Sequence, residues 1–150
     1  MDSSRQSKRP RVTGTGTIGA GRAMLSLMKI TTVVLVNLVR LLGLILIGLG
    51  ITFWSGHSLE LIPVHMRMGE VLVLLLWILA GIGVRAGVKS VLSLVAIVYG
   101  VFVVGFGMRM GTFLPGSAHT VIRVLHLLLG LGAMGLAESL AAKIKRGLAK

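Results

Sequence analysis

The sequence predicts an all-α integral membrane protein folded as a four-helix bundle. Of its 150 residues, 55% are hydrophobic and 13% are charged, whereas soluble domains carry roughly 25% charged residues. Several apolar runs also reach the length of about 20 residues that a helix needs to cross a bilayer. These proportions exclude a soluble enzyme. Because the chain has no cysteine, disulfides and thiolate metal sites are excluded as well.

The apolar runs predict one bundle over residues 30–142, with helices at 31–54, 63–84, 90–106 and 118–142. Pro63 suits the first turn of the second helix, because the backbone N–H that proline lacks has no partner there. Pro115 and Gly116 predict the turn before the fourth helix. A basic leader, residues 1–29, is expected to be flexible, and a basic tail covers residues 143–150.

Lysine and arginine are unevenly divided between the two ends of this predicted bundle. The leader, the tail and the loop with Arg85 and Lys89 fall on one side, and only Arg67, Arg109 and Arg123 fall on the other. The positive-inside rule therefore predicts that both termini lie in the cytoplasm. Topology explains the net charge of +12, so no nucleic-acid partner is expected. The basic leader and short loops favour a bacterial inner (plasma) membrane.

All four histidines, His57, His65, His119 and His126, are predicted on the external side. At about 1.5 Å rise per residue, His65 differs in depth from His126 by roughly 4.5 Å and from His119 by about 6 Å, so both pairings stay open.

A further observation favours the pairing of His65 with His126. A glycine follows each of these two histidines four residues later, at Gly69 and Gly130. Residues four apart share a helix face. A planar macrocycle beside the imidazole of His65 or His126 would need the space that each glycine leaves.

The segments HMRMG at His65 and LHLLLG at His126, within a four-helix frame over about residues 60–140, resemble the four-helix membrane-embedded b-type cytochromes. The resemblance implies one non-covalent haem b with His65 and His126 as ligands, and electron transfer with quinol as a candidate donor. The di-haem reductases of this type place histidine pairs towards both membrane faces, so a single haem is implied here.

Other ligands for this haem stay open. His57 and His119 are the alternative ligands, and zinc or copper would also suit imidazole. The haem propionates would call for external cations, which the sequence supplies as Arg67, Arg109 and Arg123.

Three further charged residues fall inside predicted helices. Arg40 and Glu138 lie at matched depth near the cytoplasmic boundary, which predicts an ion pair between the first and fourth helices, because an unpaired charge there is costly. Snorkelling of Arg40 to the interface is the alternative. Glu70, near His65, is either a proton site used alongside quinol oxidation or a hydrogen-bond partner of Arg67 or Arg123.

Two other functions stay open. A cofactor-free structural or accessory subunit, or an assembly factor, would use the histidines as interfacial residues. A small transporter is disfavoured, because small four-helix exporters carry an acidic residue in the first helix, where this chain has Asn37 and Arg40. Expected partners are the lipid bilayer, a quinone, and other membrane subunits or a second copy of the chain. No nucleophile, base and orienting group occur together, so the sequence assigns no enzymatic reaction.

Overall fold

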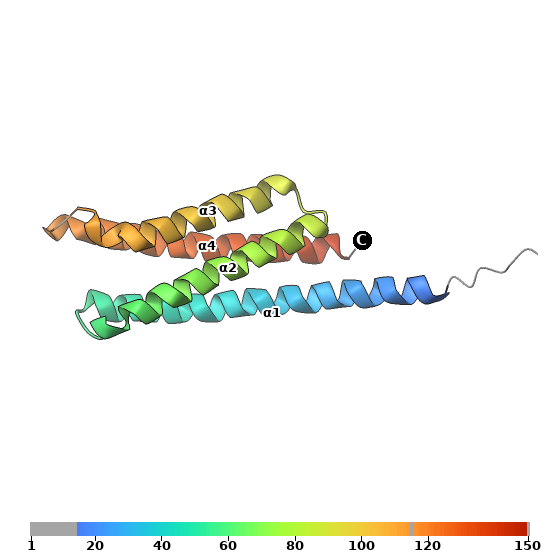
Figure 1. Cartoon of the computed structure of the whole chain (residues 1–150), viewed down its shortest axis with the longest axis horizontal. Coiled ribbons are helices and arrows are strands. Elements are labelled where there is room, and N and C mark those ends of the chain that lie inside the picture. The colour runs from blue at the N-terminus through green and yellow to red at the C-terminus, as the bar shows by residue number, and fades with distance from the viewer. Residues whose placement is uncertain (1–14, 115, 150) are drawn as a thin grey trace, which may run out of the picture.

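The computed structural model, which describes residues 15–114 and 116–149, is an all-α four-helix bundle (Figure 1). The helices are α1 (Thr15–Trp54), α2 (Ile62–Arg85), α3 (Ser90–Arg109) and α4 (His119–Gly147). Short 3₁₀ turns lie in the connections, at η1 (Leu59–Leu61), η2 (Met110–Thr112) and η3 (Gly116–Ala118). Pro63 occupies the first turn of α2, as predicted.

Successive helices run in opposite directions (Figure 1). The start of α1, the α2–α3 turn and the end of α4 therefore lie at one end of the bundle, here called the terminal end. The α1–α2 and α3–α4 connections lie at the opposite end, here called the loop end. α2 packs against all three other helices, and α4 also packs against α1 and α3.

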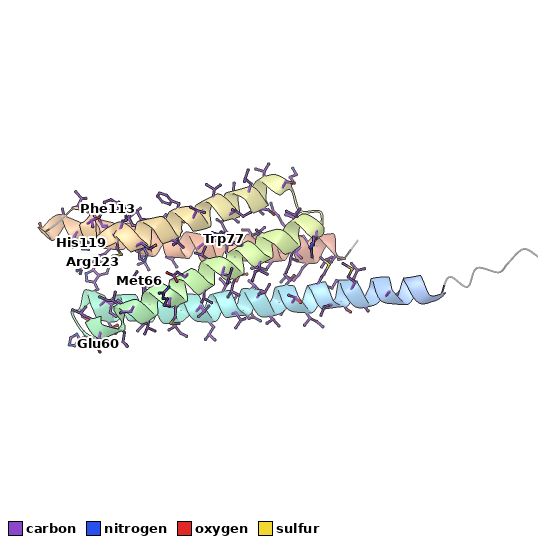
Figure 2. All side chains as sticks on the ribbon, viewed as in Figure 1. Glu60, Met66, Trp77, Phe113, His119 and Arg123 are labelled. Atoms are coloured by element: carbon purple, nitrogen blue, oxygen red, sulfur yellow. The ribbon has the colours of Figure 1, made fainter. Side chains whose placement is uncertain are left out.

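Apolar side chains cover the outside of the bundle (Figure 2). Leu44 on α1, Val91 on α3 and Leu128 on α4 are each more than half exposed. All four helices are long and apolar enough to cross a membrane. Soluble proteins rarely expose an apolar surface of this extent to water. The surface therefore indicates contact with a lipid bilayer.

The buried core lies mainly in the half of the bundle nearest the terminal end. Its largest fully buried side chains come from α1, α2, α3 and α4: Thr32, Val39, Val73, Leu76, Leu79, Ser93, Leu140 and Ile144. Small side chains fill the spaces between them, and Ala96, Ala133 and Ala137 have no exposed surface. On α4 before Ala133, Ile122 is the one buried side chain.

Glycines allow large rings to lie against neighbouring backbones in this half. A Cβ atom added to Gly100 would lie 2.5 Å from Nε1 of Trp77, which donates a hydrogen bond to the Ile97 carbonyl oxygen at 3.2 Å. A Cβ atom at Gly132 would collide with the Tyr99 ring. Both positions therefore require glycine if the helices are to keep this separation.

Two predicted boundaries differ from the structure. α1 begins at Thr15, so residues 15–29 are helical, and α4 continues past residue 142 through Gly147. Arg22 and Lys29 suggested a leader, but the alanine, leucine and methionine residues around them are strong helix formers. In the expected tail, Ile144 is fully buried in the core and prolongs α4. Residues 1–14 of the expected leader, and residue 150, lie outside the described residues. α2 agrees within one residue at each end, and α3 runs three residues further, to Arg109.

Candidate functional site: a histidine pair at the loop end

His65 and His126 face each other between α2 and α4. His65 lies in the first turn of α2, and His126 lies two turns into α4. α2 and α4 run in the same direction, opposite to that of α1 and α3 (Figure 1). The centroids of the two imidazole rings are 6.2 Å apart, and the ring planes are inclined by 47°. The structure thus brings together the histidines of the first predicted pairing.

Two phenylalanines flank this pair, so that each helix contributes one ring. Phe53 of α1 meets His65 edge to face, with ring centroids 5.4 Å apart and planes at 68°. Phe106 of α3 stacks on His126, with centroids 6.2 Å apart and planes at 13°. The imidazoles are therefore held between aromatic neighbours, and each is only partly exposed.

One ring nitrogen of each histidine is buried without a partner. Nδ1 of His65 and Nδ1 of His126 make no hydrogen bond with any described residue. Oγ of Ser93 is also buried without a partner among the described residues. It lies in the core near the terminal end and is not part of the histidine pair. A buried polar atom without a partner is costly, and native proteins rarely keep one unless water, a metal or a ligand satisfies it. Among the described residues, both rings of the pair therefore keep one buried nitrogen whose hydrogen-bonding capacity is unused.

The glycines near the pair differ in their surroundings. A Cβ atom at Gly107 of α3 would lie 3.1 Å from Cε1 of His126, so this glycine lets the backbone lie against the imidazole. A Cβ atom at Gly69 or Gly130 would meet no atom within 4 Å. The space beside Gly69 and Gly130 is therefore open, whereas the space beside Gly107 is filled by His126.

Charged residues at this end are divided between paired and unpaired ones. Nη1 of Arg67 donates a hydrogen bond to Oε2 of Glu70 at 2.9 Å, which is one of the two interpretations of Glu70 from the sequence. Among the described residues, neither Arg109 nor Arg123 forms an ion pair. Arg123 lies at the loop end of α4 (Figure 2).

The structure does not join the other two histidines to the pair. Nδ1 of His57 lies 3.4 Å from Oγ of Ser55 within the α1–α2 connection. Nδ1 of His119 lies 3.1 Å from the carbonyl oxygen of Phe113, to which it can donate a hydrogen bond across the α3–α4 connection. Over residues 15–114 and 116–149, no group of three or more His, Cys, Asp or Glu residues could hold a metal ion.

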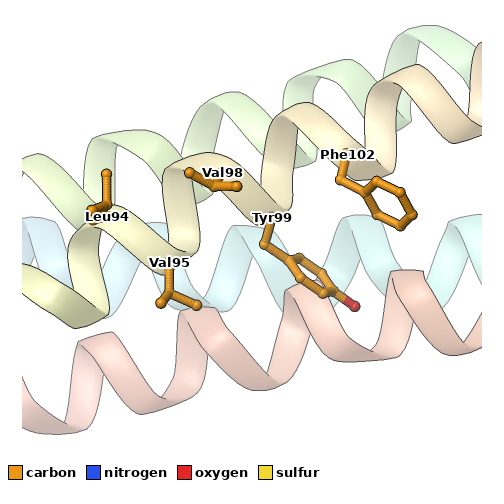
Figure 3. A pocket seen from close by; sticks show the side chains of 5 residues that line it. All are labelled: Leu94, Val95, Val98, Tyr99 and Phe102. Carbon is orange, nitrogen blue, oxygen red and sulfur yellow. The ribbon is translucent and has the colours of Figure 1, made fainter.

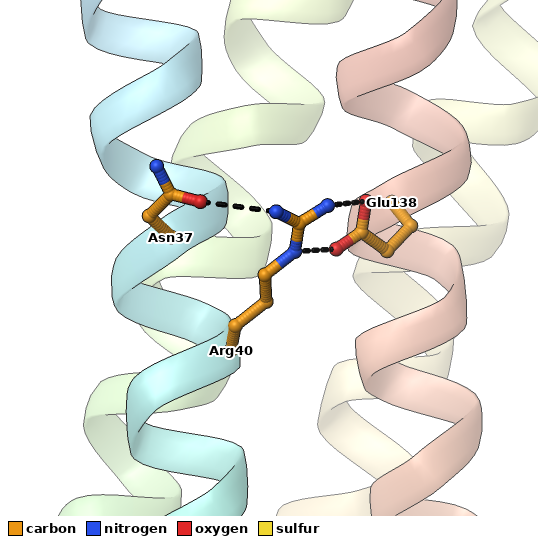
Figure 4. Close-up of polar contacts among 3 residues, drawn as sticks. All are labelled: Asn37, Arg40 and Glu138. Carbon is orange, nitrogen blue, oxygen red and sulfur yellow. Dashed lines mark hydrogen bonds and ion pairs between the residues drawn. The ribbon is translucent and has the colours of Figure 1, made fainter.

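Arg40 and Glu138 lie in contact between α1 and α4 (Figure 4). Nε of Arg40 donates to Oε1 of Glu138, Nη2 donates to Oε2 at 2.9 Å, and Nη1 donates to Oδ1 of Asn37 at 3.1 Å. Gly43 lies one helical turn from Arg40, and Met134 lies one turn from Glu138; a Cβ atom at Gly43 would collide with Met134. This close approach of α1 and α4 brings the two charged side chains within reach of each other.

An apolar hollow of about 440 Å³ lies along α3, lined by Leu94, Val95, Val98, Tyr99 and Phe102 (Figure 3). The Tyr99 hydroxyl donates a hydrogen bond to the Leu129 carbonyl oxygen at 2.9 Å, so its proton is already engaged. The hollow presents apolar carbon and suits a hydrocarbon chain rather than a reaction.

Sequence reasoning missed Phe53, Phe106 and Gly107 at the site. The small residues on both sides of Phe106, in the segment Gly105-Phe106-Gly107, mark a place where another helix can come close. That signal did not indicate which helix would approach.

Comparisons with protein-family models, curated proteins and solved structures find no match for this chain. The fold and the site therefore define its class: a small four-helix bundle of membrane-spanning length with a histidine pair at one end.

Proposed function

We propose that this chain is a small membrane protein of the b-type cytochrome class. In this proposal His65 and His126 hold one haem b near the loop end, and the protein transfers electrons with a quinol as candidate donor. The observation that carries the proposal is the pair of facing imidazoles, each with a buried Nδ1 that no described residue satisfies.

The number of available ligands favours haem over a bare metal ion. A zinc site takes three or four protein ligands, and the described residues offer no group of three. His65 and His126 would supply the two protein ligands that a haem needs, and the haem would bring one-electron redox chemistry to the site. Two histidines on different helices match that requirement.

The neighbouring residues suit such a site. Phe53 and Phe106 pack against the two imidazoles and restrict their orientation. The open space beside Gly69 and Gly130 leaves room for a bulky planar group. Arg109 and Arg123 would be the candidate cations for haem propionates, because they form no ion pair among the described residues, whereas Arg67 pairs with Glu70.

The distribution of charge supports an orientation in the membrane. Among the described residues, the terminal end carries Arg22 and Lys29 of α1, Arg85 and Lys89 of the α2–α3 turn, and Lys143, Lys145 and Arg146 of α4. We therefore assign this end to the cytoplasm by the positive-inside rule. The histidine pair then lies near the external face. The same features support a bacterial inner membrane as the location.

The visible spectrum of the purified chain tests this proposal. The wild-type protein, expressed with ample haem, is expected to show the sharp reduced α-band of a b-type haem. His65→Ala and His126→Ala should each abolish the band, whereas His57→Ala and His119→Ala should keep it. A colourless wild type would contradict the proposal, and so would a band that survives both substitutions in the pair.

A matched pair of glycine variants tests the geometry around His126. In Gly107→Ala the new methyl group would press on the imidazole, whereas Gly105 of the same helix has open space around it. We expect Gly107→Ala to shift the band or weaken haem retention, and Gly105→Ala to leave both unchanged. Equal spectra from the two variants would mean that α3 does not position His126.

A cofactor-free membrane subunit is the second candidate function. The Arg40–Glu138 pair favours this function. Both side chains stay about half exposed on the outside of the bundle, where a membrane partner would cover them. A wild type that folds and binds no haem would leave this function in place of the first.

A further inference from the structure

The described residues of the chain do not enclose the Arg40–Glu138 pair. The side chain of Arg40 is 54% exposed and that of Glu138 is 43% exposed, although both lie within helices of membrane-spanning length. Around them Leu41, Leu44 and Leu131 are exposed, so the pair interrupts an otherwise apolar face. Hydrocarbon offers no hydrogen bonds to such groups, and intramembrane charges are normally covered by protein.

The pair also keeps unused hydrogen-bonding capacity. A guanidinium has five N–H donors, and Arg40 uses three of them on Glu138 and Asn37. The carboxylate of Glu138 can accept further bonds, and the amide nitrogen of Asn37 donates to no described residue. The same small patch therefore presents spare donors and spare acceptors side by side.

Small residues on the open side of Glu138 allow another backbone to approach. Gly135 and Ala142 lie on the same helix face as Glu138, and Ser139 follows it; a Cβ atom at Gly135 would meet no atom within 4 Å. Small residues at such spacing are typical of close helix contacts in membranes. Unlike Ala133 and Ala137, which are buried inside the bundle, Gly135 and Ser139 face outwards.

We infer that the face formed by α1 and α4 around Arg40 and Glu138 is the interface of a homodimer, in which two ion pairs join into one network of four charges. A two-fold interface places the same patch against itself, and a patch with both charge signs is complementary to its own copy. A lipid phosphate would be attracted by Arg40 but repelled by Glu138, so it suits the patch less well. This inference does not depend on haem binding.

Cross-linking in liposomes tests the interface, and the cysteine-free chain makes it clean. Ser139→Cys places a single thiol on the proposed face, and Leu94→Cys places one on the exposed side of α3 at a similar distance from the terminal end. With a short bis-maleimide at low protein density, Ser139→Cys should give about tenfold more dimer than Leu94→Cys. Equal yields from the two positions, or no dimer from Ser139→Cys, would overturn the inference.

Two further variants in the Ser139→Cys background identify the contacts. Arg40→Leu combined with Glu138→Leu removes all the charges of the pair, and should lower the dimer yield about tenfold. Gly135→Leu adds a bulky side chain on the proposed face, at a position where a Cβ atom would meet no atom within 4 Å, and should do the same. Gly81→Leu, on an equally open part of α2, is the control that should keep the yield.

Undiminished dimer in both test variants would refute the interface even if one of them folded poorly. A monomer that retains anionic lipid through Arg40 in native mass spectrometry would refute it in favour of a lipid site.

Discussion

The two halves of the bundle are built differently. Near the terminal end, large side chains such as Leu76 and Leu140 have no exposed surface, and alanines and glycines let the helices approach closely. Near the loop end, the central positions hold His65 and His126 with their aromatic neighbours, and these rings stay partly exposed. One half is packed as a core, and the other holds two imidazole rings whose Nδ1 atoms make no hydrogen bond with any described residue.

From this difference we expect the terminal half of the bundle to determine stability and the loop half to determine ligand binding. A tightly packed half can hold the four helices in register while the other half keeps ring nitrogens without partners, at a free-energy cost that the core offsets. Substitutions in the terminal half should therefore change stability most, and substitutions at the histidines should change ligand binding with little effect on the fold.

The largest effect is expected from Leu76→Ala. Leu76 is fully buried in the core, and deleting such a side chain leaves a cavity that costs about 2–5 kcal/mol. Leu128→Ala on the exposed side of α4 should cost much less, because no cavity forms there. Denaturant or thermal unfolding in mild detergent, followed by circular dichroism, measures both. Similar losses of stability from the two variants would show that the terminal half is not the core.

A smaller effect is expected from Gly100→Ala. The added methyl group would lie 2.5 Å from Nε1 of Trp77 and 2.8 Å from Cγ1 of Val73, and overpacking of this kind costs about 1–3 kcal/mol. Gly105→Ala, in the same helix with open space around it, should be neutral or slightly stabilising. The order of the two thermal midpoints checks the prediction. A Gly100→Ala protein at least as stable as Gly105→Ala would contradict the close packing of α2 and α3.

The smallest effect is expected from His126→Phe in the haem-free protein. The substitution removes a buried Nδ1 that has no partner among the described residues, and replacing such a group by an apolar ring is near neutral or stabilising by about 1 kcal/mol. Unfolding of the apoprotein, prepared without haem, measures the change. A marked destabilisation would mean that His126 has a structural role, which would weaken the contrast between the two halves.

The sequence predicted most of the fold. Runs of apolar residues predicted four helices, and the bounds of α2 agree within one residue because Pro63 and Arg85 mark its ends. The start of α1 at Thr15 was not predicted, because Arg22 and Lys29 suggested the end of a membrane span. Charged residues at a solvated helix end interrupt the hydrophobic segment, but the helix continues through them. Composition alone therefore does not locate the start of α1.

The site was predictable in part. Counting residues along the predicted helices placed His65 within roughly 4.5 Å of the depth of His126 and within about 6 Å of that of His119, so both pairings stayed open. The structure sets His126 against His65, while His119 contacts the Phe113 carbonyl. Matching depths also suggested the contact of Arg40 with Glu138. Phe53 and Phe106 were not predicted, because the periodicity of one helix does not show how it is rotated against its neighbours.

The ratio of haem to polypeptide in the purified protein is the decisive measurement. If His65 and His126 hold one haem in each chain, we expect one haem per polypeptide for the wild type and none for the His65→Ala, His126→Ala double variant. A ratio of zero for the folded wild type, or an unchanged ratio in the double variant, would contradict the assignment of the histidine pair as the haem site.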